Sequence, residues 1–291
     1  MIKAQSKRLY SDVDFLCKIR PFRNYRNIES LERVCNYLKD QLRPFAYPVE
    51  ELSWFASGQE YKNLIFSYAK DKKKRLIIGA HYDVCGDQPG ADDNASAVAG
   101  LLETARLLME NQPDLDYGID LVAYCLEEPP FFDSEYMGSF IHARSLREKN
   151  VDVIGMICYE MIGYFSDEPG SQTYPDSDLA KQYPSVADFI AVVGISEFSS
   201  FNAHFYKHMQ ADSKVKVELV NFPFRQGLAG LSDQRNYWHF DYPALMINDT
   251  SFIRNPNYHE VSDTIDTLDF DKMTEVVNSC YRAILQMDRS F

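Results

Sequence analysis

The stretch "RLIIGAHYDVCGDQPGADDNAS", residues 75–96, joins an apolar run to a polar segment that holds one histidine and four aspartates. The run at 75–80 has the length and composition of a buried strand. Beyond the polar segment, apolar residues recur at helical spacing over 95–110, as expected for an amphipathic helix. A buried strand that leads through a loop into such a helix is typical of α/β folds.

The same alternation continues along the chain. Apolar runs predict further strands at 63–69, 119–126, 153–159, 189–194, 215–220 and 244–248. Helices are predicted at 28–42, where Asn27 can act as the N-cap, and near 134–148, 198–211, 231–240 and 271–287. This order indicates a mostly parallel sheet covered by helices on both faces. Because no repeat, low-complexity segment or linker interrupts it, we expect one domain over residues 1–291.

The composition argues against several classes of partner. The chain has 291 residues, 45% of them hydrophobic, and a formal net charge of −13. Nucleic acids and anionic membranes select clustered lysine and arginine, so neither is an expected partner. The basic run "KDKKKR" at 70–75 lies between two predicted strands and is interpreted as a solvated hairpin turn. The N-terminus lacks the apolar core of a secretory signal and no apolar run reaches 18 residues, which favours a cytoplasmic location.

Most cysteines and several histidines are expected to be structural. The six cysteines are scattered without a C-x-x-C pair, as is typical of small buried residues in a reducing compartment. Cys125 and Cys158 each precede an acidic residue by two positions, and both are expected to pack in the core. His204 and His208 lie four residues apart, but no acidic partner completes a metal-binding motif, so they are interpreted as surface or packing residues.

Acidic side chains and histidines follow the predicted strands at the point where each strand ends. In open α/β sheets, sites form beyond the carboxyl ends of the strands. The residues in those positions are His81, Asp83, Asp92, Asp93, Glu127, Glu128, Glu160 and His259. Carboxylates this close together repel one another unless a cation lies among them. Two histidines with several carboxylates form a nitrogen and oxygen ligand set that suits zinc and related divalent ions.

Six blocks of the sequence carry a family resemblance. They are, in order, "AHYD", "GADDNAS", "LEE", "YEMIGY", "LSDQ" and "YHEVSDTIDTL", between about Arg75 and Leu268. In this order and spacing they resemble the zinc-dependent exopeptidases (peptidase M28-like), which include bacterial leucyl-type aminopeptidases, glutamate carboxypeptidase and glutaminyl cyclases. The resemblance implies a three-layer α/β/α fold with a central, mostly parallel mixed sheet of the phosphorylase/hydrolase-like type. It also implies a zinc-peptidase domain that binds two zinc ions per chain.

The resemblance assigns the metal ligands residue by residue. His81 matches the histidine of the first zinc, and Glu160 stands where many members have an aspartate as a ligand of that zinc. Glu128 and His259 match the ligands of the second zinc. Asp92, the first residue of the "DD" pair, matches the carboxylate that bridges the two ions.

The resemblance also assigns the catalytic chemistry. Two zinc ions about 3.5–4 Å apart lower the pKa of a shared water towards roughly 7. Glu127 matches the general base, which takes a proton from the attacking water and delivers it to the departing amine. Asp83 matches the acid that orients the imidazole of His81. Asp93 or Asn94 is expected to cap the following helix, and the family often has a cis peptide between Asp92 and Asp93.

Three positions depart from the family pattern, the mildest being Ala97, where glycine is usual. Gln234 replaces the histidine of the common "SDH" block, which affects any contact that this histidine makes near the substrate. Glu160 is one methylene longer than aspartate and can still reach a metal if its strand lies slightly further back.

The leading hypothesis is a two-zinc aminopeptidase that acts on peptides or amino-acid derivatives. A glutaminyl cyclase, with one zinc and nearly the same ligands, is the second. A carboxypeptidase would need cations that bind a free carboxylate, and Arg225, Arg235 and Arg254 fall in loops near the later blocks. A binding domain without metal is disfavoured by the intact ligand set.

The aromatic residues of "EPPFFDSEYMGSF", 128–140, could line a substrate pocket or pack in the core. The sequence leaves the oligomeric state open.

Overall fold

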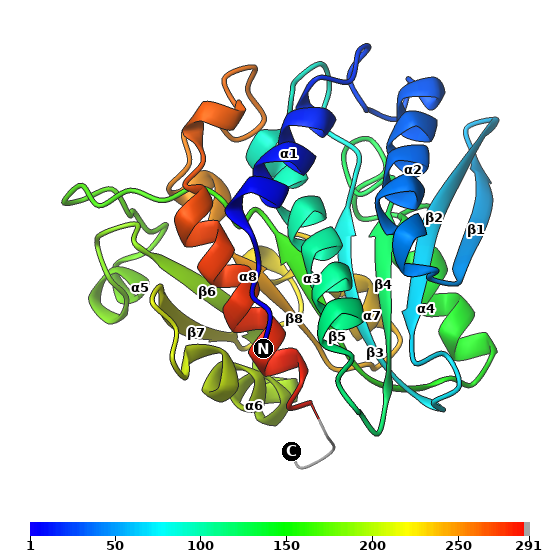
Figure 1. The fold of residues 1–291 in the computed structure, drawn as a ribbon. Helices are drawn as coiled ribbons and strands as arrows, with labels where there is room; N and C mark the ends of the chain where they lie inside the picture. Colours follow the sequence, from blue (N-terminus) through cyan, green and yellow to red (C-terminus); the bar gives the residue numbers. More distant parts are fainter. Residues whose placement is uncertain (288–291) are drawn as a thin grey trace.

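The computed structural model describes residues 1–287, which form a mixed sheet of eight strands between two layers of helices (Figure 1). The strand order is β1-β2-β4-β3-β5-β8-β6-β7. The strands are β1 (Val49–Ala56), β2 (Gln59–Tyr68), β3 (Lys74–His81), β4 (Gly118–Tyr124), β5 (Asp152–Glu160), β6 (Phe189–Ile195), β7 (Lys216–Phe222) and β8 (Ala244–Asn248).

Helices cover both faces of this sheet. Those of the described residues are α1 (Ser6–Cys17), α2 (Ile28–Leu42), α3 (Ala97–Asn111), α4 (Gly138–Glu148), α5 (Ser177–Gln182), α6 (Ser199–Gln210), α7 (Gln234–His239) and α8 (Phe270–Ile284). Helices α1, α2, α3, α6 and α8 contact one another in one layer, and α4 contacts α7 in the other. Alternate residues of β3 serve the two cores: Leu76 and Ile78 pack on one face and Ile77 on the other. The predicted three-layer α/β/α fold is therefore confirmed.

The central strands β4, β3, β5 and β8 run parallel to one another. Their carboxyl ends consequently meet at one edge of the sheet, where the acidic residues of the sequence gather. Strands β1 and β2 are antiparallel to each other, and β2 is antiparallel to β4. On the other side β6 is antiparallel to β8 and parallel to β7.

Two local predictions are wrong, and strand β1 and helices α1 and α5 were not predicted. The basic run at 70–75 connects β2 to β3, but β4 lies between these strands, so the connection is not a hairpin. The helix at 28–42 has the predicted bounds, yet the Asn27 side chain donates to the carbonyl of Phe22 at 2.6 Å instead of capping it. Strand β1 was not predicted, because most of its residues are exposed at the edge of the sheet and it lacks an apolar run.

None of the helices within residues 1–287 has both the length and the apolar composition needed to cross a membrane.

Candidate metal centre

Two imidazoles share one carboxylate at the carboxyl edge of the sheet. His81 is the last residue of β3, and His259 lies in the long loop after β8. Asp93 Oδ1 lies 3.4 Å from Nε2 of His81, and Asp93 Oδ2 lies 3.1 Å from Nε2 of His259. The two oxygens of a single buried side chain therefore face two different imidazoles.

Each imidazole also faces a second carboxylate. Glu160, at the end of β5, places Oε2 3.3 Å from Nε2 of His81. Glu128, in the loop after β4, places Oε2 3.3 Å from Nε2 of His259. The result is two groups of one imidazole and two carboxylates, and Asp93 belongs to both. Nitrogen and oxygen donors in this ratio suit zinc.

The electrostatics of the centre fit bound cations. Asp93 Oδ1 and Glu128 Oε1 are buried and accept no hydrogen bond. Burial opposes ionisation of Asp93, but the imidazoles of His259 and His81 hold its pKa well below the usual range. Burial and the charge of Asp93 raise the pKa of Glu128 to about 7. Buried carboxylates with unsatisfied oxygens are costly, and divalent cations would remove that cost, so the residues present fit a metal.

Asp92, the residue expected to bridge the centre, does not face the imidazoles. Asp92 Oδ1 accepts the backbone N–H of Gly163 at 3.0 Å, and Oδ2 accepts the side-chain amide of Asn255 at 2.8 Å. Both oxygens are thus used to hold two other loops. The backbone at Asp93, with φ −102° and ψ 90°, leaves the helical conformation, and it is this next side chain that faces the imidazoles. The cis peptide correspondingly lies between Asp93 and Asn94.

Several supporting residues were not predicted. Asp263 accepts the backbone N–H groups of Asp92 and Asp93, at 2.9 and 3.1 Å. Asn94 and Ser232 donate to Glu160 Oε2, at 3.1 and 2.7 Å. Asn94 is therefore a partner of the proposed ligand Glu160 and does not cap α3. The sequence did contain a signal for two of these supporting residues, because Asp263 and Ser232 lie inside the blocks that carry the family resemblance.

Asp83 supports the paired glutamates as well as His81. Its carboxylate accepts the backbone N–H groups of Glu127 and Glu128, each at 3.2 Å. Its Oδ1 lies 3.6 Å from Nδ1 of His81, and its backbone carbonyl lies closer to that nitrogen, at 3.2 Å. The orienting role of the Asp83 carboxylate stays a prediction, and its hydrogen bonds show a second role, since Asp83 holds the backbone from which both glutamates extend.

Glu127 belongs to neither group that shares Asp93, but its carboxylate lies with His81 and Glu128 in a third set that could hold an ion. Its Oε2 lies 3.8 Å from Nε2 of His81. Burial raises the pKa of Glu127 well above its usual range; His81 opposes this shift, while the charges of Glu128 and Glu160 add to it. A carboxylate in this position can accept a proton from a water molecule in the centre, as a general base must.

Comparison with known proteins identifies the family. The sequence profile of Peptidase family M28 matches residues 63–284. The chain belongs to peptidase family M28. It is 42% identical over 284 residues to the uncharacterized protein YfbL of Escherichia coli (strain K12), covering 94% of this chain and 86% of that protein. It is 25% identical over 227 residues to leucine aminopeptidase 1 of Blastomyces gilchristii, and spans 52% of the length of that relative. Membership of M28 supports a peptidase-type activity on peptide substrates.

Solved structures of the same fold include an aminopeptidase and a cyclase. LapA aminopeptidase of Legionella pneumophila superposes with a TM-score of 0.76 and 19% identity, covering 97% of this chain and 72% of that one. A glutaminyl cyclase of Bacteroides thetaiotaomicron superposes with a TM-score of 0.73 and 20% identity, covering 99% of both chains. At 19% and 20% sequence identity, the similarity to these two structures supports a shared fold.

In this M28 chain the loop between His81 and Asp93 is held by a buried arginine. Arg23, which precedes α2, donates to the carbonyls of Tyr82 at 3.0 Å and of Gly90 at 2.6 Å. The same guanidinium donates to the carbonyls of Leu16 and Pro89. One cation thus binds four backbone oxygens, of which those of Gly90 and Leu16 also accept a backbone N–H, from Ala95 and Ile19.

We expect Arg23→Lys to lower the free energy of unfolding by about 2–4 kcal/mol. An ammonium group cannot span the carbonyls that a planar guanidinium reaches, and each lost charge-assisted bond is worth about 1.5–3 kcal/mol. Urea denaturation measures the change. Arg26→Lys is the matched control, because Arg26 is exposed and a surface change of this kind stays within about 0.5 kcal/mol. Equal unfolding midpoints for the two variants would contradict the role given to Arg23.

The remaining cysteine and histidine predictions are confirmed. Cys125 and Cys158 are buried, and burial raises the pKa of both thiols well above the usual range. His204 and His208 lie on α6 with ring centroids 4.8 Å apart and planes tilted by 56°, and Nε2 of His204 lies 2.7 Å from the carbonyl of Gln286. Neither histidine belongs to any group within residues 1–287 that could hold a metal.

Proposed function

We propose that the chain is a two-zinc aminopeptidase. The observation that carries the proposal is the sharing of Asp93 between the imidazoles of His81 and His259. His81, Asp93 and Glu160 would hold one ion, and His259, Asp93 and Glu128 the other. Bound zinc would supply Lewis-acid polarisation of a water molecule and of the scissile carbonyl.

The chain's own groups would move the protons. Glu127 would accept a proton from the attacking water on its carboxylate and return it to the nitrogen of the departing amine. Asp83 would keep Glu127 in place through the backbone N–H that its carboxylate accepts. Since Glu128 is fixed by the same carboxylate, the base and its metal-binding neighbour are positioned together.

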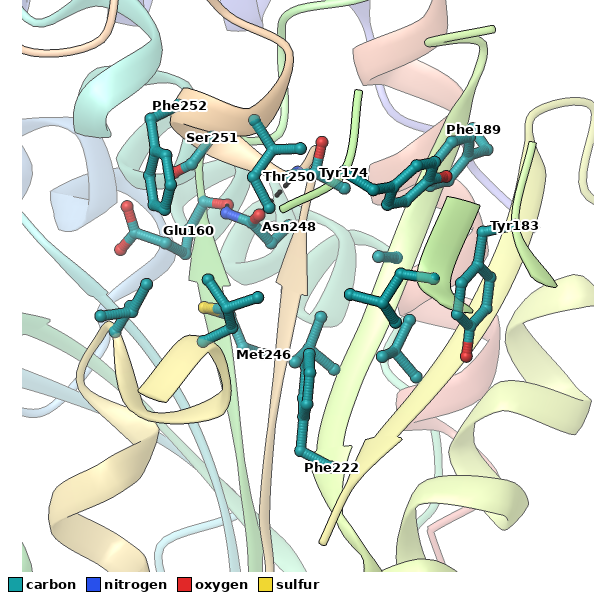
Figure 2. A pocket seen from close by; sticks show the side chains of 17 residues that line it. Glu160, Tyr174, Tyr183, Phe189, Phe222, Met246, Asn248, Thr250, Ser251 and Phe252 are labelled. Atoms are coloured by element: carbon teal, nitrogen blue, oxygen red, sulfur yellow. Dashed lines mark hydrogen bonds between the residues drawn. The ribbon is translucent and has the colours of Figure 1, made fainter. Parts of the chain in front are cut away.

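An apolar cavity beside Glu160 supports a preference for apolar N-terminal residues (Figure 2). It has a volume of about 80 Å³ and lies over β6, β7 and β8. Its walls are mostly aliphatic and aromatic, and include Phe189, Val193, Phe222, Met246 and Phe252. None of the aromatic residues of 128–140 lines it; Phe131 instead packs against Tyr25 and Tyr61.

The three arginines considered for a carboxypeptidase are bound by the chain itself. Arg225 pairs with Glu197 and Asp241, and Arg235 pairs with Asp133. Arg254 is buried and donates to backbone carbonyls. No lysine or arginine among the described residues lines the apolar cavity. These three arginines are therefore not free to bind the carboxylate of a carboxypeptidase substrate, which favours the aminopeptidase.

We expect zinc-loaded protein to hydrolyse leucine p-nitroanilide, to lose this activity with a chelator and to regain it with zinc. Elemental analysis should give about two metal ions per active chain. Because the cavity is apolar, kcat/KM for leucine should exceed that for glutamate by at least about tenfold. The N-acetylated leucine substrate is the control and should not be cleaved. Hydrolysis of the blocked substrate alone would contradict an aminopeptidase.

A glutaminyl cyclase is the alternative favoured by the superposition with a cyclase over 99% of both chains. Such an enzyme would convert an N-terminal glutamine to pyroglutamate and release ammonia, and the resemblance implies one zinc. Ammonia release from a glutaminyl peptide at one metal ion per chain, without hydrolysis of leucine p-nitroanilide, would replace the aminopeptidase proposal with this one.

A further inference from the structure

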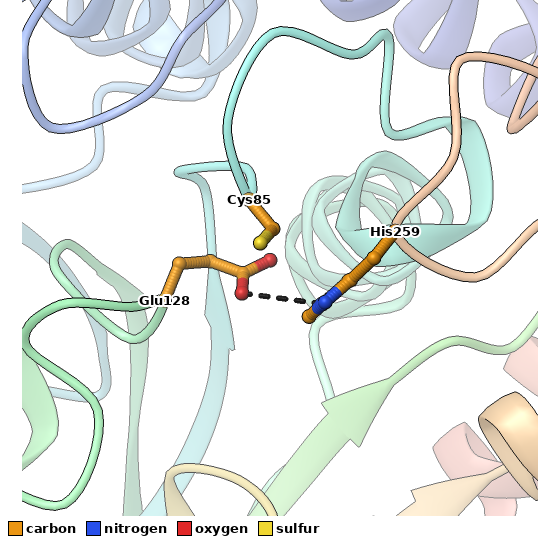
Figure 3. Close-up of side chains that lie close together, drawn as sticks. All are labelled: Cys85, Glu128 and His259. Carbon is orange, nitrogen blue, oxygen red and sulfur yellow. Dashed lines mark ion pairs between the residues drawn. The ribbon is translucent and has the colours of Figure 1, made fainter.

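A cysteine faces the second group of the centre. Cys85 lies in the loop after β3, four residues beyond His81. Its Sγ, a carboxylate oxygen of Glu128 and a ring nitrogen of His259 all lie within 4.8 Å of one another. Figure 3 shows the three side chains converging from three separate segments.

An unpartnered carboxylate oxygen points into the same space. Glu128 is only 4% exposed, and its Oε2 is paired with His259. Its Oε1 is buried and accepts no hydrogen bond. A neutral thiol does not compensate a buried carboxylate oxygen, whereas a cation bound by both groups would do so.

We propose that Cys85 is a side-chain ligand of the second metal ion, together with Glu128, His259 and the bridging Asp93. The inference rests on the proposed two-metal centre and adds a ligand to it. Binding would replace the S–H bond of the thiol by a sulfur–metal bond and release the proton to solvent. The second position would then have a sulfur, nitrogen and oxygen donor set, which favours zinc over magnesium or manganese, while the first would have nitrogen and oxygen donors only.

Cobalt absorption tests the sulfur ligand directly. We expect Co²⁺ titration of the metal-free protein to produce a thiolate-to-metal charge-transfer band in the near ultraviolet that saturates at one thiolate per chain. Cys85→Ser should abolish this band, and Cys280→Ser, a buried cysteine on α8, should keep it. A wild-type protein that binds two cobalt ions without the band, or a band that survives in Cys85→Ser, would overturn the proposal.

Thiol protection gives a second measurement that needs no variant. Cys85 is partly exposed, and the other five cysteines are buried. Iodoacetamide should therefore modify chiefly Cys85 in the metal-free protein, as mapped by mass spectrometry, and zinc should slow this reaction at least about tenfold. An alkylation rate at Cys85 that zinc does not change would overturn the proposal.

The assays separate this inference from the proposed function. If the cobalt band appears but no peptide with a free amine is hydrolysed, Cys85 is a metal ligand and the aminopeptidase proposal fails. If leucine p-nitroanilide is hydrolysed and the band is absent, the ligand proposal alone fails. In Cys85→Ser the second ion should bind at least about tenfold more weakly, since even residues that only support a ligand contribute 10–100-fold to metal affinity.

Discussion

Replacing Glu127 by glutamine is expected to lower kcat by about 10²–10⁴-fold, the range typical of a lost general base. The amide keeps the size of the side chain but cannot accept the proton of the attacking water. Metal content should stay at the wild-type value, because Glu127 lies 3.8 Å from His81 and belongs to neither group that shares Asp93. Steady-state kinetics on leucine p-nitroanilide, with elemental analysis of the same sample, measure both quantities.

Glu135→Gln is the matched control for this substitution. Glu135 is exposed in the loop that follows the paired glutamates, so its change should leave kcat and metal content as in the wild type. A Glu127→Gln protein that keeps more than about a tenth of the wild-type kcat would show that another group takes the proton. One that loses its metal would show that Glu127 is a ligand.

Asp93→Asn should remove most of the bound metal and nearly all activity. Asp93 pairs with both imidazoles, one through each carboxylate oxygen, so neutralising it removes a ligand from both positions at once. We expect the affinity for zinc to fall by more than the 10–100-fold that is typical of residues which only support a ligand. Metal content after dialysis measures the loss.

Asp92→Asn, one residue away, should behave differently. Both Asp92 oxygens accept hydrogen bonds, and an amide would leave one buried donor unsatisfied, at a cost of about 1–3 kcal/mol. The variant should therefore unfold at lower urea concentration while it still binds two metal ions. The opposite pattern, with metal lost from Asp92→Asn and retained by Asp93→Asn, would reverse the assignment made from the geometry.

The sequence predicted the elements whose signals are local. Apolar runs located seven of the eight strands, and the rule for the carboxyl ends of parallel strands pointed to the edge where His81 and Glu160 meet. The sequence did not predict which strands are neighbours in the sheet. That depends on contacts between distant segments, as the insertion of β4 between β2 and β3 shows.

The choice between Asp92 and Asp93 could not be read from spacing. Two adjacent carboxylates differ in position by one residue, and the torsion angles of the loop decide which one faces the metal centre. Cys85 was passed over for a related reason. It matches no ligand of the family pattern, and only the folded loop brings it beside Glu128 and His259.

The hydrogen bonds that Arg23 donates to the loop between His81 and Asp93 limit how far the N-terminus of this peptidase can be shortened. The family profile begins at residue 63, forty positions after that arginine. A protein trimmed to the profile would retain every proposed zinc ligand, but the loop between His81 and Asp93 would lose the hydrogen bonds that Arg23 donates to it. The residues that match the family profile are therefore not expected to fold as a stable fragment on their own. Expression of this peptidase should include the roughly sixty residues that precede the profile.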